Sequence, residues 1–259
     1  MKKLLIAAAA VLPAWTAVAA QDDSRDMRVR VGVGGQLLPQ FIGSDKTDFA
    51  PLVHVNIAHG TDEFSFGSPD DSPGIALISK GGFSFGPVGN IQARRENSDV
   101  GAHVGSVPRT FEAGAFAQYL AGDSFRIRAE LRKGVNGHQG LVGYLGADKI
   151  WRNGDKYVFS IGPRVLFSDA RYERTYFGVT PEASLATGLP VDRPGAGVHA
   201  VALTSGMSYQ LSNRWGLFGY GRFARLIGDA GKSPIVREFG SRNQLSGGIG
   251  LDYTFTIHR

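Results

Sequence analysis

The fold of this chain is decided by residues 124–133, SFRIRAELRK, running from Ser124 to Lys133. Apolar and polar side chains alternate strictly along it. Phe, Ile, Ala and Leu stand at positions 125, 127, 129 and 131, and Arg, Arg, Glu and Arg stand at 126, 128, 130 and 132. A period of two residues is that of a β-strand with two different faces. The decapeptide therefore predicts a strand with one apolar face and one face carrying three arginines and a glutamate.

The arginine face separates two all-β architectures. A soluble β-sandwich also alternates, so periodicity alone leaves a sandwich and a membrane barrel open. In a transmembrane barrel the apolar side meets lipid and the polar side lines a wet interior. Three arginines and a glutamate on one face favour the barrel.

The same alternation recurs along the chain, for example in residues 27–33, 111–119, 157–167 and 245–255. Residues 215–226 alternate less cleanly, and the orientation of that strand stays open. Aromatic residues near the expected strand ends suit the girdles at the two membrane interfaces, although ordinary sheet packing is the alternative. They are Tyr119, Trp151, Tyr157, Trp215, Tyr253 and Phe255.

Composition narrows the protein class. The 259 residues are 42% hydrophobic and 20% charged, which excludes disorder, and the chain has no cysteine. Disulfide scaffolds, zinc–thiolate sites and thiol nucleophiles are therefore excluded. The formal net charge is +5, and it falls to +3 if Lys2 and Lys3 leave with an export signal. That excess is too small to favour a nucleic-acid partner.

The first twenty residues have the pattern of a cleaved signal peptide. Lys2 and Lys3 precede an apolar run from Leu4 to Leu12, and small residues follow up to Ala20. The run is shorter than the ~20 residues of a spanning helix. We expect cleavage near Ala20 and one barrel domain over residues 21–259.

Turn spacing gives a strand count. Tight turns are expected at 121–123, 152–155 and 212–213, and long polar segments at 96–109, 169–196 and 228–242. Ten strands follow, near residues 27–38, 50–59, 82–95, 110–120, 124–134, 138–151, 156–168, 197–211, 213–227 and 243–256. If residues 62–80 form two short strands, the result is a closed antiparallel transmembrane barrel of about twelve strands; if they form none, it has ten.

The polar faces of these strands predict a charge network in the lumen. Its expected members are Arg28, Arg30, Arg94, Arg126, Arg128, Arg132 and Arg164 against Glu112, Glu130, Asp148 and Asp252. If the first strand meets the last, Asp252 pairs with Arg28 and Arg30. The charges would then plug the lumen, which is favoured, or leave a narrow passage for anions.

The end of the chain resembles the closing-strand signal by which the barrel-assembly machinery recognises outer-membrane barrels. Gly250 is followed three and five positions later by Tyr253 and Phe255, with a four-residue tail beyond. Taken together, further motifs resemble the MipA/OmpV family of outer-membrane proteins. They are Gly43-Ser44-Asp45 with Pro51, Phe85-Gly86-Pro87, Tyr176-Phe177-Gly178-Val179 and Ser233-Pro234-Ile235-Val236.

This resemblance implies an outer-membrane barrel that is not an enzyme but a scaffold for murein remodelling. The implied partners are a lytic transglycosylase and a murein synthase, beside membrane lipid and lipopolysaccharide. A small-solute channel or a surface adhesin is the alternative. Basic residues in the expected outer loops suit lipopolysaccharide phosphates: Lys46, Arg109, Arg171, Arg174, Arg193, Lys232, Arg237 and Arg242.

Catalytic and metal-binding motifs are not evident. The six histidines lack metal-ligand spacing, and no G-x-S-x-G elbow occurs, so neither a metal nor a cofactor is expected. His54 and His199 are expected to form hydrogen bonds in the lumen. A lipid-modifying enzyme would need a Ser, a His and an acid gathered at one rim. Asp70-Asp71 is interpreted as a solvated loop pair.

Overall fold

The computed structural model describes residues 26–258, so the expected signal peptide lies outside the described residues. Its eleven strands form a single antiparallel sheet. They are β1 Met27–Pro39, β2 Thr47–His59, β3 Ile78–Lys80, β4 Phe83–Gln92, β5 Thr110–Ala121, β6 Phe125–Gly134, β7 Leu141–Asn153, β8 Tyr157–Ser168, β9 Gly197–Gln210, β10 Trp215–Leu226 and β11 Asn243–Ile257. The all-β antiparallel expectation is confirmed.

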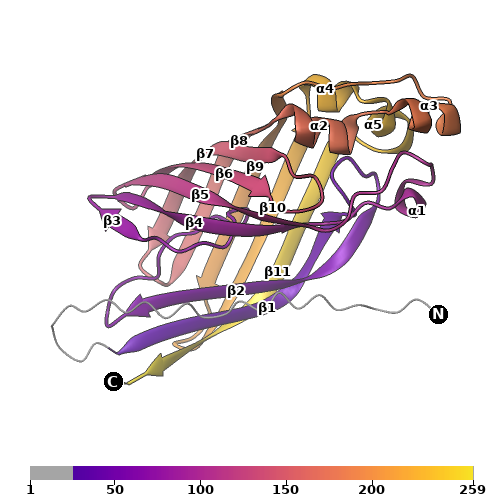
Figure 1. Ribbon diagram of the computed structural model, residues 1–259. Helices are drawn as coiled ribbons and strands as arrows, with labels where there is room; N and C mark the ends of the chain where they lie inside the picture. The colour runs from indigo at the N-terminus through magenta and orange to yellow at the C-terminus, as the bar shows by residue number, and fades with distance from the viewer. Residues whose placement is uncertain (1–25, 259) are drawn as a thin grey trace.

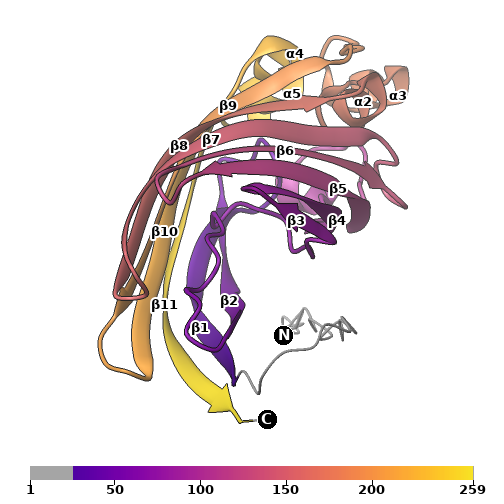
Figure 2. The ribbon, with the colours of Figure 1, turned by 90° about the vertical axis from the view of Figure 1, so that its left-hand side faces the viewer.

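The sheet curls around an interior that we call the lumen, which lies on its concave side (Figure 2). Neighbouring strands follow the order β2-β1-β11-β10-β9-β8-β7-β6-β5-β4-β3. The first strand therefore pairs with the last, with Met27 opposite Ile257. Among the described residues no ladder joins β2 to β3. The expected closed ring of twelve strands is thus replaced by eleven strands with two edges.

The missing strand is explained by residues 60–77, which we call the strap. From β2 the strap enters the lumen instead of joining the sheet, then returns along β4, where Ile75 N donates to Pro87 O at 3.2 Å and Gly74 bridges to Val88. Only three residues of the return form a strand, β3. Residues 62–80 do not form two membrane crossings: the chain reaches the middle of β4, where Gly74 bridges to Val88, and then turns back toward the turn end.

The two ends of the sheet differ (Figure 1). At the turn end lie Met27, Ile257 and the short connections at 122–124, 154–156 and 211–214, close to the expected tight turns. At the opposite, cap end lie five short helices: α1 Asn97–Val100, α2 Ala170–Phe177, α3 Pro181–Thr187, α4 Gly228–Lys232 and α5 Pro234–Phe239. Within residues 26–258 no helix is long and apolar enough to cross a membrane.

The faces of the strands are those that the alternation predicts. In β6 the outward side chains of Phe125 and Ile127 are 41% and 45% exposed, whereas Arg126 is 1% exposed. The strand whose orientation was open, β10, turns Trp215 and Phe223 outward and Phe218 inward. The sheet is therefore apolar outside and polar inside.

The six aromatic residues expected near strand ends lie at one end of the sheet instead of at both. Tyr119, Trp151, Tyr157, Trp215, Tyr253 and Phe255 all lie near strand termini at the turn end. Near the cap end, large outward aromatic side chains are phenylalanines, such as Phe49, Phe111 and Phe223. The outward Tyr and Trp side chains of the sheet are therefore concentrated at the turn end.

The apolar core lies in the cap. One cluster packs Tyr172, Tyr176 and Phe177 of α2 against strand residues and Val236 of α5. A second joins Val179 and Ile235 to loop residues. The long polar segments were expected as loops, but short helices bury enough apolar surface between them to cover the cap end of the lumen (Figure 1).

Candidate functional site in the barrel lumen

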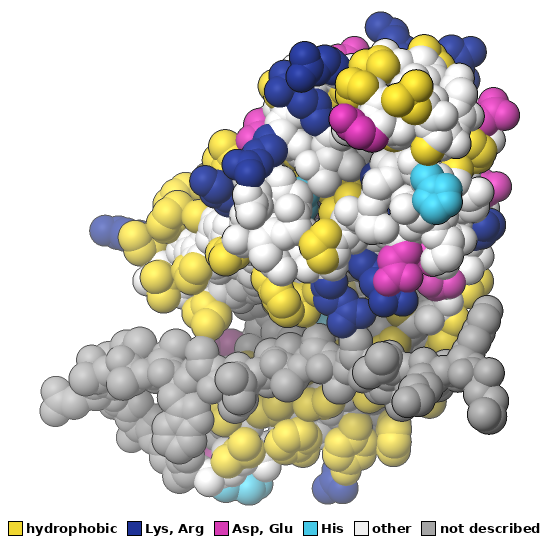
Figure 3. Space-filling view, turned by 45° about the vertical axis from the view of Figure 1, so that its right-hand side comes forward, with side chains coloured by type: hydrophobic (Ala, Val, Ile, Leu, Met, Phe, Trp, Pro, Cys, Tyr) yellow, Lys and Arg dark blue, Asp and Glu magenta, His cyan; other side chains and the backbone are white. Residues whose placement is uncertain are grey.

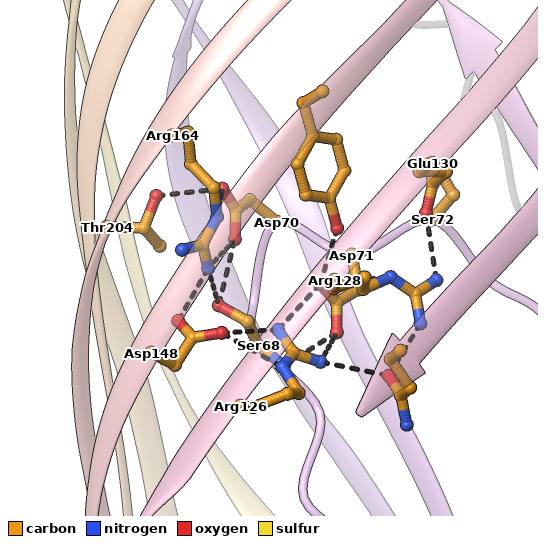
Figure 4. A network of polar contacts seen from close by, with 12 residues as sticks. Ser68, Asp70, Asp71, Ser72, Arg126, Arg128, Glu130, Asp148, Arg164 and Thr204 are labelled. Carbon is orange, nitrogen blue, oxygen red and sulfur yellow. Dashed lines mark hydrogen bonds and ion pairs between the residues drawn. The ribbon is translucent and has the colours of Figure 1, made fainter. Parts of the chain in front are cut away.

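The strap presents two adjacent carboxylates to the lumen wall (Figure 4). Asp71 accepts from both terminal nitrogens of Arg126, with Nη1–Oδ2 at 2.5 Å and Nη2–Oδ1 at 3.0 Å. Tyr144 Oη donates to Asp71 Oδ1 at 2.8 Å, and Arg128 Nε lies 3.6 Å from that oxygen. The interpretation of Asp70-Asp71 as a solvated pair is wrong, because the strap runs inside the sheet.

Asp70 is held in a similar way by the next strands. Arg164 on β8 donates through Nε to Oδ2 at 3.2 Å and through Nη2 to Oδ1 at 3.1 Å. Thr204 Oγ1 on β9 donates to Oδ2 at 2.8 Å, and Arg222 Nε lies 3.7 Å from the same oxygen. Each strap aspartate therefore faces an arginine fork, a geometry that matches the two carboxylate oxygens.

Asp148 on β7 joins the two forks. Its carboxylate lies 2.7 Å from Arg126 Nη2 and 2.7 Å from Arg164 Nη2. Asp148, Arg126 and Arg164 are each 1–2% exposed. An unpaired charge at such depth would be very costly, and here every charged group has an opposite partner.

A second group of charges lies between the strap and the cap. Arg132 pairs with Glu112 at 2.7 Å and also with Glu130, and Arg128 pairs with Glu130 at 2.8 Å. His138 Nε2 lies 2.9 Å from Glu112 Oε1. Ser72 of the strap donates to Glu130 at 2.5 Å, so the strap contacts this group as well.

Near the turn end the strap packs over the first strand. The ring of Phe64 lies under the guanidinium groups of Arg28 and Arg30, 4.9 Å and 4.0 Å from its centroid. Arg30 Nε lies 3.7 Å from Asp252, across the β1–β11 junction. Asp252 stands directly opposite Gly32, which places Arg30 on the diagonal.

Two expected members of the network differ from the prediction, Arg28 in its partner and Arg94 in its position. Arg28 does not pair with Asp252. It is nearer the turn end, where Asp155 of the β7–β8 turn lies 3.0 Å from its Nη1 and Gly60 O accepts from its Nε. Arg94 follows the end of β4, and its side chain is 60% exposed beside Glu96. The structure brings the other nine expected residues into the lumen, in the contacts given above.

Sequence reasoning missed Asp70, Asp71, Tyr144 and Arg222. Tyr144 follows the alternation of its strand, which is enough to predict that its side chain points into the lumen. Arg222 lies on the strand whose orientation was open, and its inward direction follows from the pairing of β10 with β9 and β11. The strap aspartates carry no periodic signal.

The expected assembly-signal residues lie on β11. Phe255 points outward and is 42% exposed, and the Tyr253 ring contacts Trp215 with centroids 4.9 Å apart. Gly250 points inward, and a Cβ there would lie 2.6 Å from Phe218 and from Val33 O. The glycine therefore allows β1 and β11 to approach.

A Ser, a His and an acid do meet at the cap end, but not as a nucleophilic triad. Ser168 Oγ lies 2.8 Å from His199 Nδ1 and donates to Glu173, whose Oε1 is 3.6 Å from the same Nδ1. In a triad the serine and the acid use opposite ring nitrogens. Here both lie beside Nδ1, Nε2 has no partner, and the serine proton goes to the carboxylate. Burial of this cluster raises the pKa of Glu173 to about 7.

The two expected lumen histidines differ in their contacts. His199 forms its hydrogen bond to Ser168 at the cap end. His54 instead packs on the Phe218 ring, with centroids 5.3 Å apart, and its buried Nδ1 lacks a hydrogen-bond partner. Over residues 26–258, no group of three or more His, Asp or Glu side chains is arranged to hold a metal ion.

Three of the four motifs that carry the family resemblance meet in the cap, whereas Phe85-Gly86-Pro87 lies within β4. A Cβ on Gly43, whose φ is 90°, would lie 3.0 Å from Val236 and 3.8 Å from Phe177. Ser233 Oγ donates to Phe177 O at 2.7 Å. Motifs almost two hundred residues apart in the chain therefore build one packing unit over the lumen.

Solved structures resembling this chain include bacterial envelope proteins. The translocator domain of the autotransporter NalP from Neisseria meningitidis is 16% identical, with a TM-score of 0.37 over 91% of this chain and 90% of that chain. OmpT of Vibrio cholerae, expressed in the outer membrane, is 9% identical, with a TM-score of 0.37 over 91% of this chain and 99% of that chain. The N-terminal β-barrel domain of OprF from Pseudomonas aeruginosa is 7% identical, with a TM-score of 0.27 over 90% of this chain and 100% of that chain. Likenesses of this size carry no functional inference.

A search of curated proteins found no match. The model of the family described as MltA-interacting protein MipA matches residues 31–255, which include the whole sheet apart from the outermost residues of β1 and β11. This chain therefore belongs to the MipA family of MltA-interacting proteins.

Proposed function

We propose that this protein is an outer-membrane β-barrel that acts as a scaffold for murein-remodelling enzymes. The observation that carries the scaffold role is the family match over residues 31–255, because the family is named for its interaction with MltA. The implied partners are a lytic transglycosylase and a murein synthase. The chain is an interaction protein, not an enzyme.

The membrane location is supported by the surface of the sheet. Every long strand turns large apolar residues outward, and many of them are 40–60% exposed. Figure 3 shows hydrophobic side chains on the flank of the molecule and Lys and Arg side chains near the cap. An apolar outer band around a polar interior is the pattern of a transmembrane barrel. Unpaired strand edges are costly in lipid, so we expect the edges of β2 and β3 to approach each other in the membrane.

The orientation follows from the connections. Outer-membrane barrels have short turns toward the periplasm and longer loops outside. The turn end therefore faces the periplasm and the cap faces outward, with Lys232, Arg237 and the other exposed loop cations beside lipopolysaccharide phosphates. The turn end is then the surface available to a murein enzyme.

Site-specific photocrosslinking in cells tests the scaffold role. A photoreactive residue at Asn213, in the β9–β10 turn, is expected to capture a lytic transglycosylase. The matched control is Leu185 on α3, which is 90% exposed at the cap end and should capture none. Failure at Asn213 and at the other short turns, or equal capture at Leu185, would refute the proposal.

A further inference from the structure

The strap aspartates occupy a site built by the barrel wall. Arg126, Tyr144, Arg164 and Thr204 come from four consecutive strands, β6 to β9. Between them they give each strap carboxylate an arginine fork and a hydroxyl donor, at the distances given above. Strand positions hold such donors more precisely than loops do.

The wall has an excess of positive charge without the strap. Five arginines contribute to it, Arg126, Arg128, Arg132, Arg164 and Arg222, against three wall carboxylates, Glu112, Glu130 and Asp148. The two strap aspartates bring the total to neutrality. A group that neutralises the wall must therefore carry a charge of −2.

Two buried donors on this wall remain without a hydrogen-bond partner. They are Arg128 Nε and Arg222 Nε, 3.6 Å and 3.7 Å from the nearest strap oxygens. The strap thus fills the site without satisfying all of its donors, as expected of an occupant constrained by its own backbone. A free ligand with two carboxylates has more freedom to reach them.

We propose that the arginine wall is a binding site for small dicarboxylates, occupied in this structure by Asp70 and Asp71 of the strap. The strap has the advantage of attachment, since a tethered group has an effective concentration on the order of millimolar. Removing its two charges leaves the positive excess of the wall without an anion. This proposal does not depend on the scaffold role, because a crosslinking failure at Asn213 would leave it untouched.

The test uses the full mature chain folded in detergent micelles, with D70N/D71N as the variant and succinate as the probe. Succinate is expected to raise the unfolding midpoint of the variant by about 5 °C at about 100 times its Kd. Succinamide with sodium chloride at equal ionic strength should give no shift. The wild-type chain and the exposed-turn control Asp123→Asn should respond weakly, because their strap aspartates already neutralise the wall.

A further variant separates site binding from general anion effects. Adding R164Q to D70N/D71N removes one fork and should weaken the succinate response at least tenfold. If D70N/D71N does not fold, its refolding yield from urea becomes the measurement, and succinate should restore it whereas succinamide should not. Equal responses to succinate and succinamide, or an unchanged response with R164Q, would overturn the proposal.

Discussion

Replacing Arg126 by methionine removes the charge at the centre of the network while keeping most of the side-chain length. Arg126 contacts Asp71 at 2.5 Å and Asp148 at 2.7 Å, and the three side chains are 1%, 12% and 1% exposed. Breaking a buried pair by removing one partner typically costs about 3–5 kcal/mol, because the other charge is left uncompensated. Both carboxylates would lose a partner at once.

Residual contacts reduce this cost. Asp148 keeps Arg164 at 2.7 Å, and Asp71 keeps Tyr144 at 2.8 Å and Arg128 at 3.6 Å. We therefore expect the lower end of the range, about 3 kcal/mol. The matched control is Arg94→Met, whose side chain is 60% exposed and whose ion pair with Glu96 should contribute about 0–1 kcal/mol.

Equilibrium urea unfolding of residues 21–259 from lipid vesicles measures both variants. Trp151 and Trp215 point outward, 45% and 51% exposed, so their emission reports departure from the apolar phase. The double variant Arg126→Met/Asp71→Asn should be less destabilised than the two single changes added together, because neither charge is then left alone. If Arg126→Met and Arg94→Met agree within about 0.5 kcal/mol, the usual scatter of surface changes, the network does not hold the strap as argued.

Three further outcomes are expected. Gly34→Val should abolish the heat-modifiable folded band on electrophoresis, because a Cβ there would lie 2.1 Å from Ile249 O, whereas Gly67→Ala, with nothing within 4 Å, should keep it; retention by both refutes the packing argument. Because burial raises the pKa of Glu173 to about 7 from an ordinary 4.5, the contribution of Glu173 to cap stability is complete below about pH 4.5 and is lost as pH rises through 7; the protection of residues 169–196 against hydrogen exchange, corrected for the intrinsic exchange rate at each pH, should fall over this interval, and Glu173→Gln should remove that fall. Phe255→Ser should reduce the amount assembled in the outer membrane of cells but not refolding into micelles; equal loss in both would make Phe255 a packing residue instead of a recognition signal.

Much of the sheet is determined locally. In Phe125-Arg126-Ile127-Arg128 the period of two and the difference between faces are enough to predict which side chains enter the lumen. Local turn chemistry likewise predicts the short connections. Of the charge network, the members on well-alternating strands are predictable for the same reason, and Arg94 fails because its strand ends before it.

The sequence by itself therefore determined the strand periodicity, the apolar outer face and the basic lumen. Only the tertiary structure decided that the strap turns inward, that Asp70 and Asp71 neutralise the wall, and that the outer loops fold into a cap. The reason is physical: a strand's faces depend on neighbours two residues apart, whereas Asp70 and Thr204 are 134 residues apart in the chain. Such a contact depends on the curvature of the whole sheet, which the alternation of neighbouring residues does not specify.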